Sequence, residues 1–317
     1  MTMNVRIRGD GVAARCCAHL LSQAGFGVSF EPGSRPRVPA IMLGEAAQRL
    51  MRDIFQRDDL FRDLPRITKR IVKWGAEPVE LEHSAVVVSE EYLLNSLEPA
   101  SLKQRHADWT IYAAAPLPAS TTEHRFGSRV AAPMGVELKA GARTDACWIE
   151  AVEDGWLFLN SGWLLAVGSL EKSTIIKEQI ARVDSATVSF SASPRMVAPL
   201  GGDGWIACGS AAMAFDPLCG DGAAHAVREA ILASAVIRAV ARGDDPGPLL
   251  AHYEARLIAG FQRHLALCRQ FYLSGGDGPW WRAEAEATVR GIEWCGGRLE
   301  GHGRFRYQLH GLELSVV

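Results

Sequence analysis

The chain has 317 residues, 48% of them hydrophobic and 22% charged, which is an ordinary composition for a globular protein. A formal net charge of −2 gives no electrostatic reason to expect nucleic acid or an anionic membrane as a partner, and no apolar run approaches the roughly 20 residues of a membrane span. The N-terminus lacks a signal-peptide pattern, and the seven cysteines form no C-x-x-C pair. We therefore expect a cytoplasmic protein with mostly buried thiols.

The first motif follows a short strand-like run at residues 4–8. The sequence GDGVAA begins at Gly9, leads into a helical run, and is followed by a second strand that ends at Glu31. In a dinucleotide site Gly9 makes the tight turn, Gly11 lets the pyrophosphate approach, and Ala14 lets the helix pack on the strand. Glu31 lies at the distance of a ribose-binding acid. The pattern predicts a dinucleotide site.

The middle of the chain is predicted to be rich in β-strands. A proline-rich loop leads to an amphipathic helix from about Glu45, and residues 66–89 are expected to form adjacent strands of a second sheet. Residues 90–105 predict a helix broken at Pro99, and residues 173–183 predict an amphipathic helix. Short strands with glycine turns between these helices suggest antiparallel hairpins.

The second motif runs from Gly204 to Ser234. A short apolar strand ends in a Gly-Ser turn, and Asp216-Pro217-Leu218 leads to the loop Gly220-Asp221-Gly222, which opens an alanine-rich helix. A glycine loop at a helix N-terminus exposes backbone N–H groups and lets a flat ligand come close. We expect a site for an anionic or electron-rich ligand here.

This second motif resembles the FAD motif G-D-A-A-x-x-x-x-P-L-x-G-x-G of flavoprotein monooxygenases of the p-hydroxybenzoate hydroxylase type, which flavin-dependent tryptophan halogenases share. Ser210 stands where that motif has Asp. Together with the N-terminal motif, the resemblance implies FAD as the cofactor. The FAD-contacting residues that it implies are Gly9, Gly11, Ala14, Glu31, Arg37, Ser210, Asp216, Pro217, Gly220 and Gly222.

The resemblance also implies an α/β fold. It consists of a Rossmann-type, three-layer FAD-binding domain with an inserted mixed or antiparallel β-sheet as substrate layer, followed by C-terminal helices. The corresponding divisions are an FAD-binding domain of residues 1–65, 90–130 and 195–245, a substrate layer of 66–89 and 131–194, and a helical region of 246–317.

The activity that the resemblance implies is hydroxylation of an aromatic substrate through a flavin C4a-hydroperoxide. The substrate is a small aromatic molecule or an indole-like group tethered to a carrier or protein, and the electrons come from NAD(P)H or a separate flavin reductase. Trp156 and Phe158 resemble the G-W-x-W/F-x-x-P element of the family, and with Trp74 they are predicted to line the substrate pocket. A packed sheet core is an equally good reading of Trp156 and Phe158.

Two further candidates concern catalysis. Lys69 precedes Trp74 by five positions, as a lysine precedes a tryptophan in the halogenases, and His83 in the same predicted sheet is a candidate acid or base. Basic residues along a strand more often mark its solvated face. The histidines show no metal-binding spacing, so no metal site is predicted.

Two alternatives remain beside the monooxygenase. One is a halogenase-like enzyme. The other is a degenerate FAD fold that binds a partner without catalysis, because Asp10 puts a like charge in the phosphate loop, Ser210 replaces an acid, and residues 113–116 (AAAP) lack the acid of the third family motif.

Overall fold

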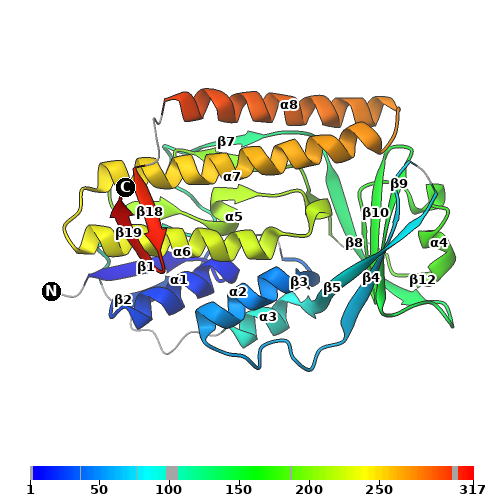
Figure 1. Ribbon diagram of the computed structural model, residues 1–317, viewed down its shortest axis with the longest axis horizontal. Coiled ribbons are helices and arrows are strands. Elements are labelled where there is room, and N and C mark those ends of the chain that lie inside the picture. Colours follow the sequence, from blue (N-terminus) through cyan, green and yellow to red (C-terminus); the bar gives the residue numbers. More distant parts are fainter. Residues whose placement is uncertain (1–2, 36, 76, 98–105, 186–187, 302–305) are drawn as a thin grey trace.

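The computed structural model describes residues 3–35, 37–75, 77–97, 106–185, 188–301 and 306–317, which form two main sheets and three long helices (Figure 1). The first sheet has the strand order β15-β16-β6-β1-β2, in which only β15 runs antiparallel to its neighbour. Its strands are β1 (Asn4–Arg8), β2 (Gly27–Glu31), β6 (Trp109–Tyr112), β15 (Gly201–Gly202) and β16 (Trp205–Ala207).

Helix α1 (Val12–Gln23) connects β1 to β2, which makes a parallel β-α-β unit of the Rossmann type. Val5 and Ile7 alternate along β1 and are fully buried. Ala14 is fully buried as well, and its small side chain lets α1 pack closely in the core. The structure confirms the helix (α1) and the following strand (β2) that the N-terminal motif predicted.

The second sheet has the order β12-β8-β11-β10-β9-β4-β5-β3, and β13 (Phe190–Ser191) also pairs with β8. It is mixed, because β4 and β9 run parallel whereas the other pairs are antiparallel. Its strands are β3 (Ala40–Gly44), β4 (Arg66–Lys73), β5 (Val79–Ser89), β8 (Val130–Leu138), β9 (Ala146–Val152), β10 (Gly155–Asn160), β11 (Trp163–Ala166) and β12 (Ile180–Val183). This sheet corresponds to the predicted substrate layer, with β3 as an addition from the segment assigned to the FAD-binding domain.

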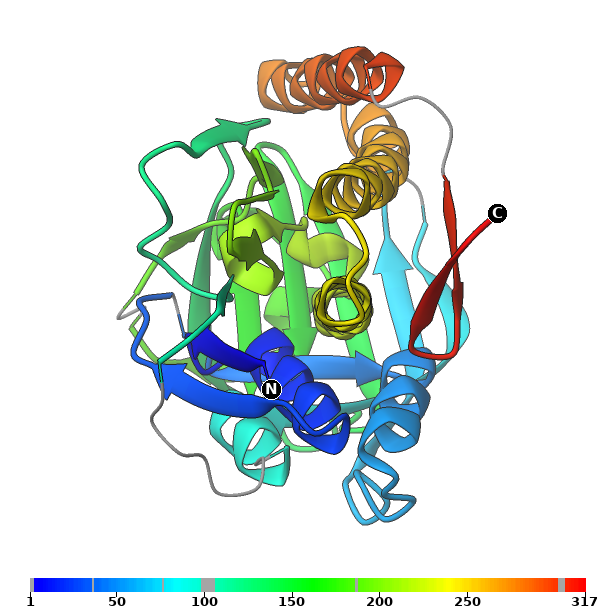
Figure 2. The ribbon, with the colours of Figure 1, turned by 90° about the vertical axis from the view of Figure 1, so that its left-hand side faces the viewer.

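Three long helices cover the first sheet. In both views α6, α7 and α8 succeed one another outward, with α8 farthest from the sheet (Figures 1 and 2). They are α6 (Gly222–Ala241), α7 (Pro246–Ser274) and α8 (Pro279–Glu300). The remaining elements are α2 (Glu45–Phe55), α3 (Glu90–Ser96), α5 (Gly209–Ala212), the small sheet of β7 (Thr122–Arg125), β14 (Arg195–Ala198) and β17 (Met213–Ala214), and the hairpin of β18 (Tyr307–His310) and β19 (Glu313–Val316).

The helix predicted over residues 173–183 is wrong. The structure has a 3-10 turn (Leu170–Lys172), the single-turn helix α4 (Ile176–Gln179) and then β12. The buried carboxylate of Glu150 accepts hydrogen bonds from the backbone N–H groups of Thr174 and Ile176, which holds the turn in place. The chain then pairs with β8 and becomes the edge strand β12 instead of continuing as a helix. The helix predicted over 90–105 ends at Ser96, and its break at Pro99 lies outside the described residues.

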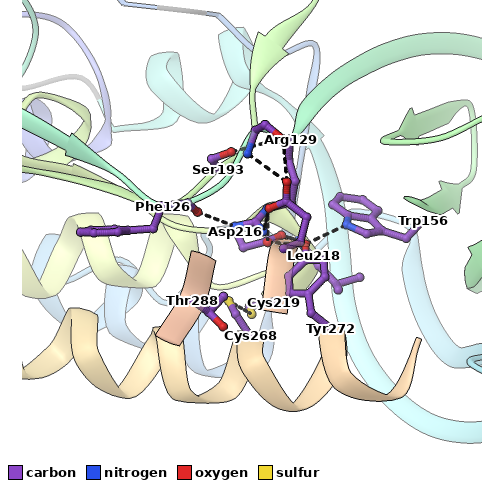
Figure 3. Close-up of polar contacts among 12 residues, drawn as sticks. Phe126, Arg129, Trp156, Ser193, Asp216, Leu218, Cys219, Cys268, Tyr272 and Thr288 are labelled. Carbon is purple, nitrogen blue, oxygen red and sulfur yellow. Dashed lines mark hydrogen bonds and ion pairs between the residues drawn. The ribbon is translucent and has the colours of Figure 1, made fainter. Parts of the chain in front are cut away.

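A buried ion cluster joins the start of β8, the segment before α6, and helices α7 and α8 (Figure 3). The Arg129 side chain is fully buried; its Nε lies 3.2 Å from Asp216 Oδ2, and its Nη1 donates to Glu284 Oε2. The Tyr272 hydroxyl donates to Asp216 Oδ2 at 2.6 Å, and the guanidinium carbon lies 4.5 Å from the Tyr272 ring centre. Because a buried charge is costly without its partner, this cluster fixes the segment around Asp216.

Replacing Arg129 with methionine should lower the free energy of unfolding by about 3–5 kcal/mol, because two carboxylates lose their buried partner. The matched control is Arg125→Met, which removes a partly exposed ion pair with Glu123 and should have little effect. Urea unfolding of both variants measures the difference. Equal midpoints would show that the cluster does not stabilise the fold.

Candidate functional site

A cavity of about 370 Å³ lies where loops of the first sheet meet one face of the second. Its wall includes Gly11–Ala13 at the start of α1 and Gly220–Ala223 at the start of α6. The opposite wall consists largely of apolar side chains from the second sheet, including Ile149, Phe158 and Trp163. The cavity therefore combines a polar end made of helix starts with an apolar end, as ligand sites commonly do.

The first helix start belongs to the N-terminal glycine motif. Gly9 has a φ of +110°, and a Cβ there would lie 2.7 Å from the Cβ of Ala114, so a side chain cannot be accommodated. Gly11 is the N-cap of α1 and has no side chain to accept from the helix, so the first N–H groups stay available at the cavity wall. This arrangement suits a phosphate group.

Asp10 does not line the cavity. Its carboxylate accepts from Arg35 Nε at 3.0 Å and from Arg37 Nη2 at 2.6 Å. Arg35 also donates to Glu90 Oε1 at 2.6 Å. The Arg35 side chain lies close to Gly11: a Cβ added to Gly11 would be 3.2 Å from Arg35 Nε. The like charge that the sequence placed in the phosphate loop is thus offset by two arginines. Arg37, predicted to contact the cofactor, lies outside the lining and binds Asp10 instead.

Glu31 ends β2 beside the glycine motif, but its carboxylate is bound by the neighbouring strand. Oε1 accepts from Arg8 Nη2 at 2.7 Å, and Arg6 Nε lies 3.9 Å from Oε2. Glu31 is not among the residues that line the cavity. A contact with a ribose would therefore have to compete with Arg8.

The second helix start belongs to the Gly204–Ser234 motif. A 3-10 turn, η2 (Pro217–Cys219), ends at Gly220 with a φ of +70°, and α6 begins at Gly222. The N-cap Asp221 makes no capping hydrogen bond, so this helix also presents its first N–H groups to the cavity. Asp216 contributes to the lining, yet its side chain is fully buried in the ion cluster (Figure 3).

Ser210, which replaces the family's acid, lines the cavity near the first glycine motif. Its hydroxyl donates to the carbonyl oxygen of Ala113 at 3.2 Å. Two positions after Ala113, Ala115 forms an antiparallel backbone bridge with Ser34. The segment that lacks the third family acid is therefore held by backbone hydrogen bonds.

The apolar wall follows the alternation of two paired strands. Phe158 and Asn160 lie on the same face of β10, opposite Leu165 and Trp163 of β11, and all four line the cavity. Asn160 is only 6% exposed, and its side-chain oxygen Oδ1 has no hydrogen-bond partner. An unpaired buried acceptor is costly, so a water molecule or a ligand is expected to supply its partner. Sequence reasoning placed Phe158 here and missed the other three.

Trp156 and Trp74, the other predicted pocket residues, are not among the residues that line the cavity. Trp156 is fully buried and donates to the Tyr272 hydroxyl at 3.1 Å. Trp74 donates to the carbonyl oxygen of Phe271 at 3.0 Å and stacks edge-on against Trp281. Both residues join the second sheet to the long helices, and their contact with a substrate stays a prediction.

Lys69 and His83 also lie outside the cavity lining. The Lys69 ammonium is paired with Glu80 and Glu82 at the sheet surface. Strand alternation puts Arg70 on the opposite face, and its side chain lines the cavity. His83 lies 3.2 Å from Arg70, and burial together with that cation lowers its pKa. On this strand the cation at the cavity is thus Arg70, one position from the predicted lysine.

Glu229 on α6 is a buried acid of the cavity wall. It is 5% exposed, and its Oε2 accepts from the Gly209 N–H at 2.7 Å. Burial raises the pKa of this carboxyl from 4.5 to about 8, and the hydrogen bond from Gly209 only partly opposes the shift. Glu229 is therefore mostly protonated at neutral pH.

A second cavity of about 940 Å³ lies between α6, α7 and the C-terminal hairpin. It shares Met213, Phe215, Asp221 and Glu229 with the first cavity. Basic side chains outnumber acidic ones along its wall; they are Arg228, Arg256, Arg263, His225 and His252. The excess of cationic groups favours an anionic ligand.

No protein-family model and no curated protein matches this sequence. Among solved structures, the peptidyl tryptophan dihydroxylase QhpG is 17% identical and matches 100% of this chain and 86% of its own, with a TM-score of 0.71. The myxobacterial chondrochloren halogenase CndH is 16% identical over 94% of this chain and 90% of its own, with a TM-score of 0.74. PqsL, a probable FAD-dependent monooxygenase from Pseudomonas aeruginosa, is 13% identical over 95% and 99%, with a TM-score of 0.64.

The chain has the fold of FAD-dependent halogenases and monooxygenases. At the level of the fold, the resemblance inferred from the two glycine motifs is confirmed. None of the helices described in this flavoprotein-like structure is both long and apolar enough to cross a membrane.

The buried carboxyl of Glu229 predicts a specific pH dependence of stability. Between about pH 4.5 and pH 8 the folded chain keeps a proton that the unfolded chain releases, so stability falls as pH rises through this window. The Glu229→Gln variant should lack this component, which has an upper bound of about 5 kcal/mol. Urea unfolding at several pH values, with the exposed Glu286→Gln as control, tests this; parallel curves for wild type and Glu229→Gln would contradict it.

Proposed function

We propose that the protein is an FAD-dependent oxidoreductase, and specifically a monooxygenase that hydroxylates an aromatic substrate. The observation that carries this proposal is the single cavity in which two uncapped helix starts face an apolar, aromatic-lined sheet. The low sequence identity to the flavoproteins limits that comparison to the fold, so the activity rests on the site itself.

The residues of the cavity fit FAD. Gly11 and the free N–H groups of α1 would hold the pyrophosphate, with Arg35 as the nearby cation. Pro217, Gly220 and Gly222 would lie against the flavin ring, and the start of α6 would favour negative charge on that ring. Ser210 would also face the cofactor, because it lines the same cavity.

Bound FAD would supply the activation of dioxygen and the transfer of one oxygen atom. The protein's part is to orient the substrate and to exclude water. Phe158 and Trp163 offer apolar and aromatic surface for a ring. The Asn160 oxygen is available to accept a hydrogen bond from an N–H group, as an indole or an amide would provide.

The same observation supports an indole-like substrate, either free or tethered to a carrier or protein. The fold neighbour QhpG is a peptidyl tryptophan dihydroxylase, which agrees with an N–H-bearing aromatic ring at Asn160. Hydroxylation is favoured over halogenation because no lysine is found among the described residues that line the cavity, and Lys69 is paired at the surface.

The proposal predicts tight and specific binding of FAD. The Gly11→Asp variant should bind FAD at least tenfold more weakly, because the new carboxylate would cap α1 and repel the phosphates. Gly44→Asp is a matched control: Gly44 is also an extended N-cap glycine, but it begins α2 outside the cavity lining. Two measurements compare the variants: the flavin absorbance that each protein retains after desalting, and the FAD affinity from an equilibrium titration.

Two results would contradict this prediction. Wild-type protein that takes up no FAD at high micromolar concentration would refute the flavoenzyme. Equal FAD affinity of the two aspartate variants would show that FAD binds without the start of α1.

The electron donor remains either NAD(P)H or a separate flavin reductase, and we propose direct docking of NAD(P)H in the second, basic cavity. Its phosphates would meet Arg228 and Arg263, next to the wall shared with the first cavity. The Arg263→Ala variant should raise the NADH or NADPH concentration for half-maximal anaerobic reduction about tenfold, compared with Arg290→Ala on the exposed side of α8. Reduction that requires an added reductase would contradict direct docking.

A further inference from the structure

Behind the Pro217–Cys219 turn lies a cluster of two thiols and one imidazole. Cys219 of η2 faces His264 and Cys268 of α7, and one ligand atom of each lies within 4.8 Å of the other two. We propose that this cluster binds a zinc ion and thereby ties the turn to α7. Sequence spacing predicted no metal site, because the ligands come from segments about 45 residues apart.

The distances match a tetrahedral zinc site. With Zn–S bonds of about 2.3 Å and Zn–N bonds of about 2.0 Å, tetrahedral angles place two sulfurs about 3.8 Å apart, and a sulfur and a nitrogen about 3.5 Å apart. The Sγ atoms of Cys219 and Cys268 are separated by 3.9 Å, and Cys268 Sγ lies 3.3 Å from His264 Nε2. The third pair of ligand atoms, from Cys219 and His264, lies within 4.8 Å, so side-chain movements would bring all three to bonding distance of one ion.

The helix places two of the ligands. His264 and Cys268 are four residues apart on α7, so they lie on the same helix face, the spacing that also serves metal ligands in H-E-x-x-H helices. Cys268 and His264 are buried, whereas Cys219 is partly exposed and offers an entry path. The three residues are therefore prearranged and reachable.

The charge balance favours a divalent ion in this buried place. Binding displaces one proton from each thiol to solvent, and the two thiolates then neutralise the two charges of zinc. The imidazole ligand is uncharged, so the loaded site has no net charge to bury. A water molecule would complete the coordination, because the described residues supply three ligands.

One hydrogen bond opposes binding. His264 Nε2 accepts from the backbone N–H of Asp216 at 2.9 Å, and zinc would take over this lone pair. The ion would replace that link between the turn and α7 by coordinate bonds to the same two elements. Since Gly220 follows Cys219 directly and lines the cavity, metal occupancy would affect the wall of the candidate FAD site.

The chain contains its own control. Cys17 and Cys208 bring their Sγ atoms to 4.0 Å, almost the same separation, but both side chains are fully buried. Their neighbourhood contributes to no described group of three metal ligands. If two close thiols were enough to bind zinc, the protein would have two zinc sites. The proposal requires the histidine as well and therefore predicts one.

The test uses the full-length protein, reduced with a phosphine and stripped of metal by a chelator. Zinc affinity is measured by competition with a chromophoric chelator, and cobalt is the spectroscopic probe. Wild type and Cys208→Ser should bind one equivalent and give the thiolate-to-cobalt absorption of a tetrahedral site. Cys219→Ser and Cys268→Ser should bind at least 100-fold more weakly and lack that absorption.

Zinc should also raise the melting temperature of wild type and Cys208→Ser but not of Cys219→Ser. If Cys268→Ser fails to fold, Cys219→Ser decides, because its side chain is partly exposed on a turn. Unchanged zinc affinity in Cys219→Ser, cobalt spectra without thiolate bands, or a Cys219–Cys268 disulfide as the only change would overturn the proposal. None of these readouts requires FAD, so the proposed function can fail separately.

Discussion

The N-terminal N–H groups of α1 and α6 are left without a side-chain cap, and both sets face the same cavity. Among the other helices, Ser89 caps α3 and Asp245 caps α7, whereas α2 and α8 begin at the uncapped glycines Gly44 and Gly278 and do not line this cavity. Unsatisfied helix starts are expensive unless water or a ligand completes them. The parallel β-α-β unit and the glycine turns bring these two starts together, and this constraint explains why glycine recurs at both.

The surroundings of these helix starts show how the chain compensates for departures from a common pattern. Asp10 would repel a phosphate if it faced the cavity, but Arg35 and Arg37 hold its carboxylate. Ser210 uses its hydroxyl on the backbone of Ala113, where an acid is usual in the family that the motif resembles. The two arginines offset the like charge of Asp10, which was one of the three arguments for a degenerate site, and Ser210 is satisfied by a local hydrogen bond.

The sequence could predict the parts of the site that depend on backbone shape. Glycine patterns located both helix starts, and the alternation of β10 placed Phe158 on the cavity face. It could not predict which face of β4 would meet the cavity, since a shift of one residue exchanges Lys69 for Arg70. Asn160 gave no signal either, because its importance lies in the absence of a partner, which only three-dimensional packing reveals.

The segment between Asp216 and Gly220 is controlled from behind the cavity. At one end, Arg129 and Tyr272 hold the carboxylate of Asp216 in a buried ion cluster. At the other end, Cys219 approaches the thiol of Cys268, and both partners, Tyr272 and Cys268, come from α7 (Figure 3). Because Tyr272 and Cys268 both belong to α7, this one helix contacts both ends of the turn that leads into α6. The long C-terminal helices therefore do more than cover the core: they set the position of the glycine loop that forms the cavity wall.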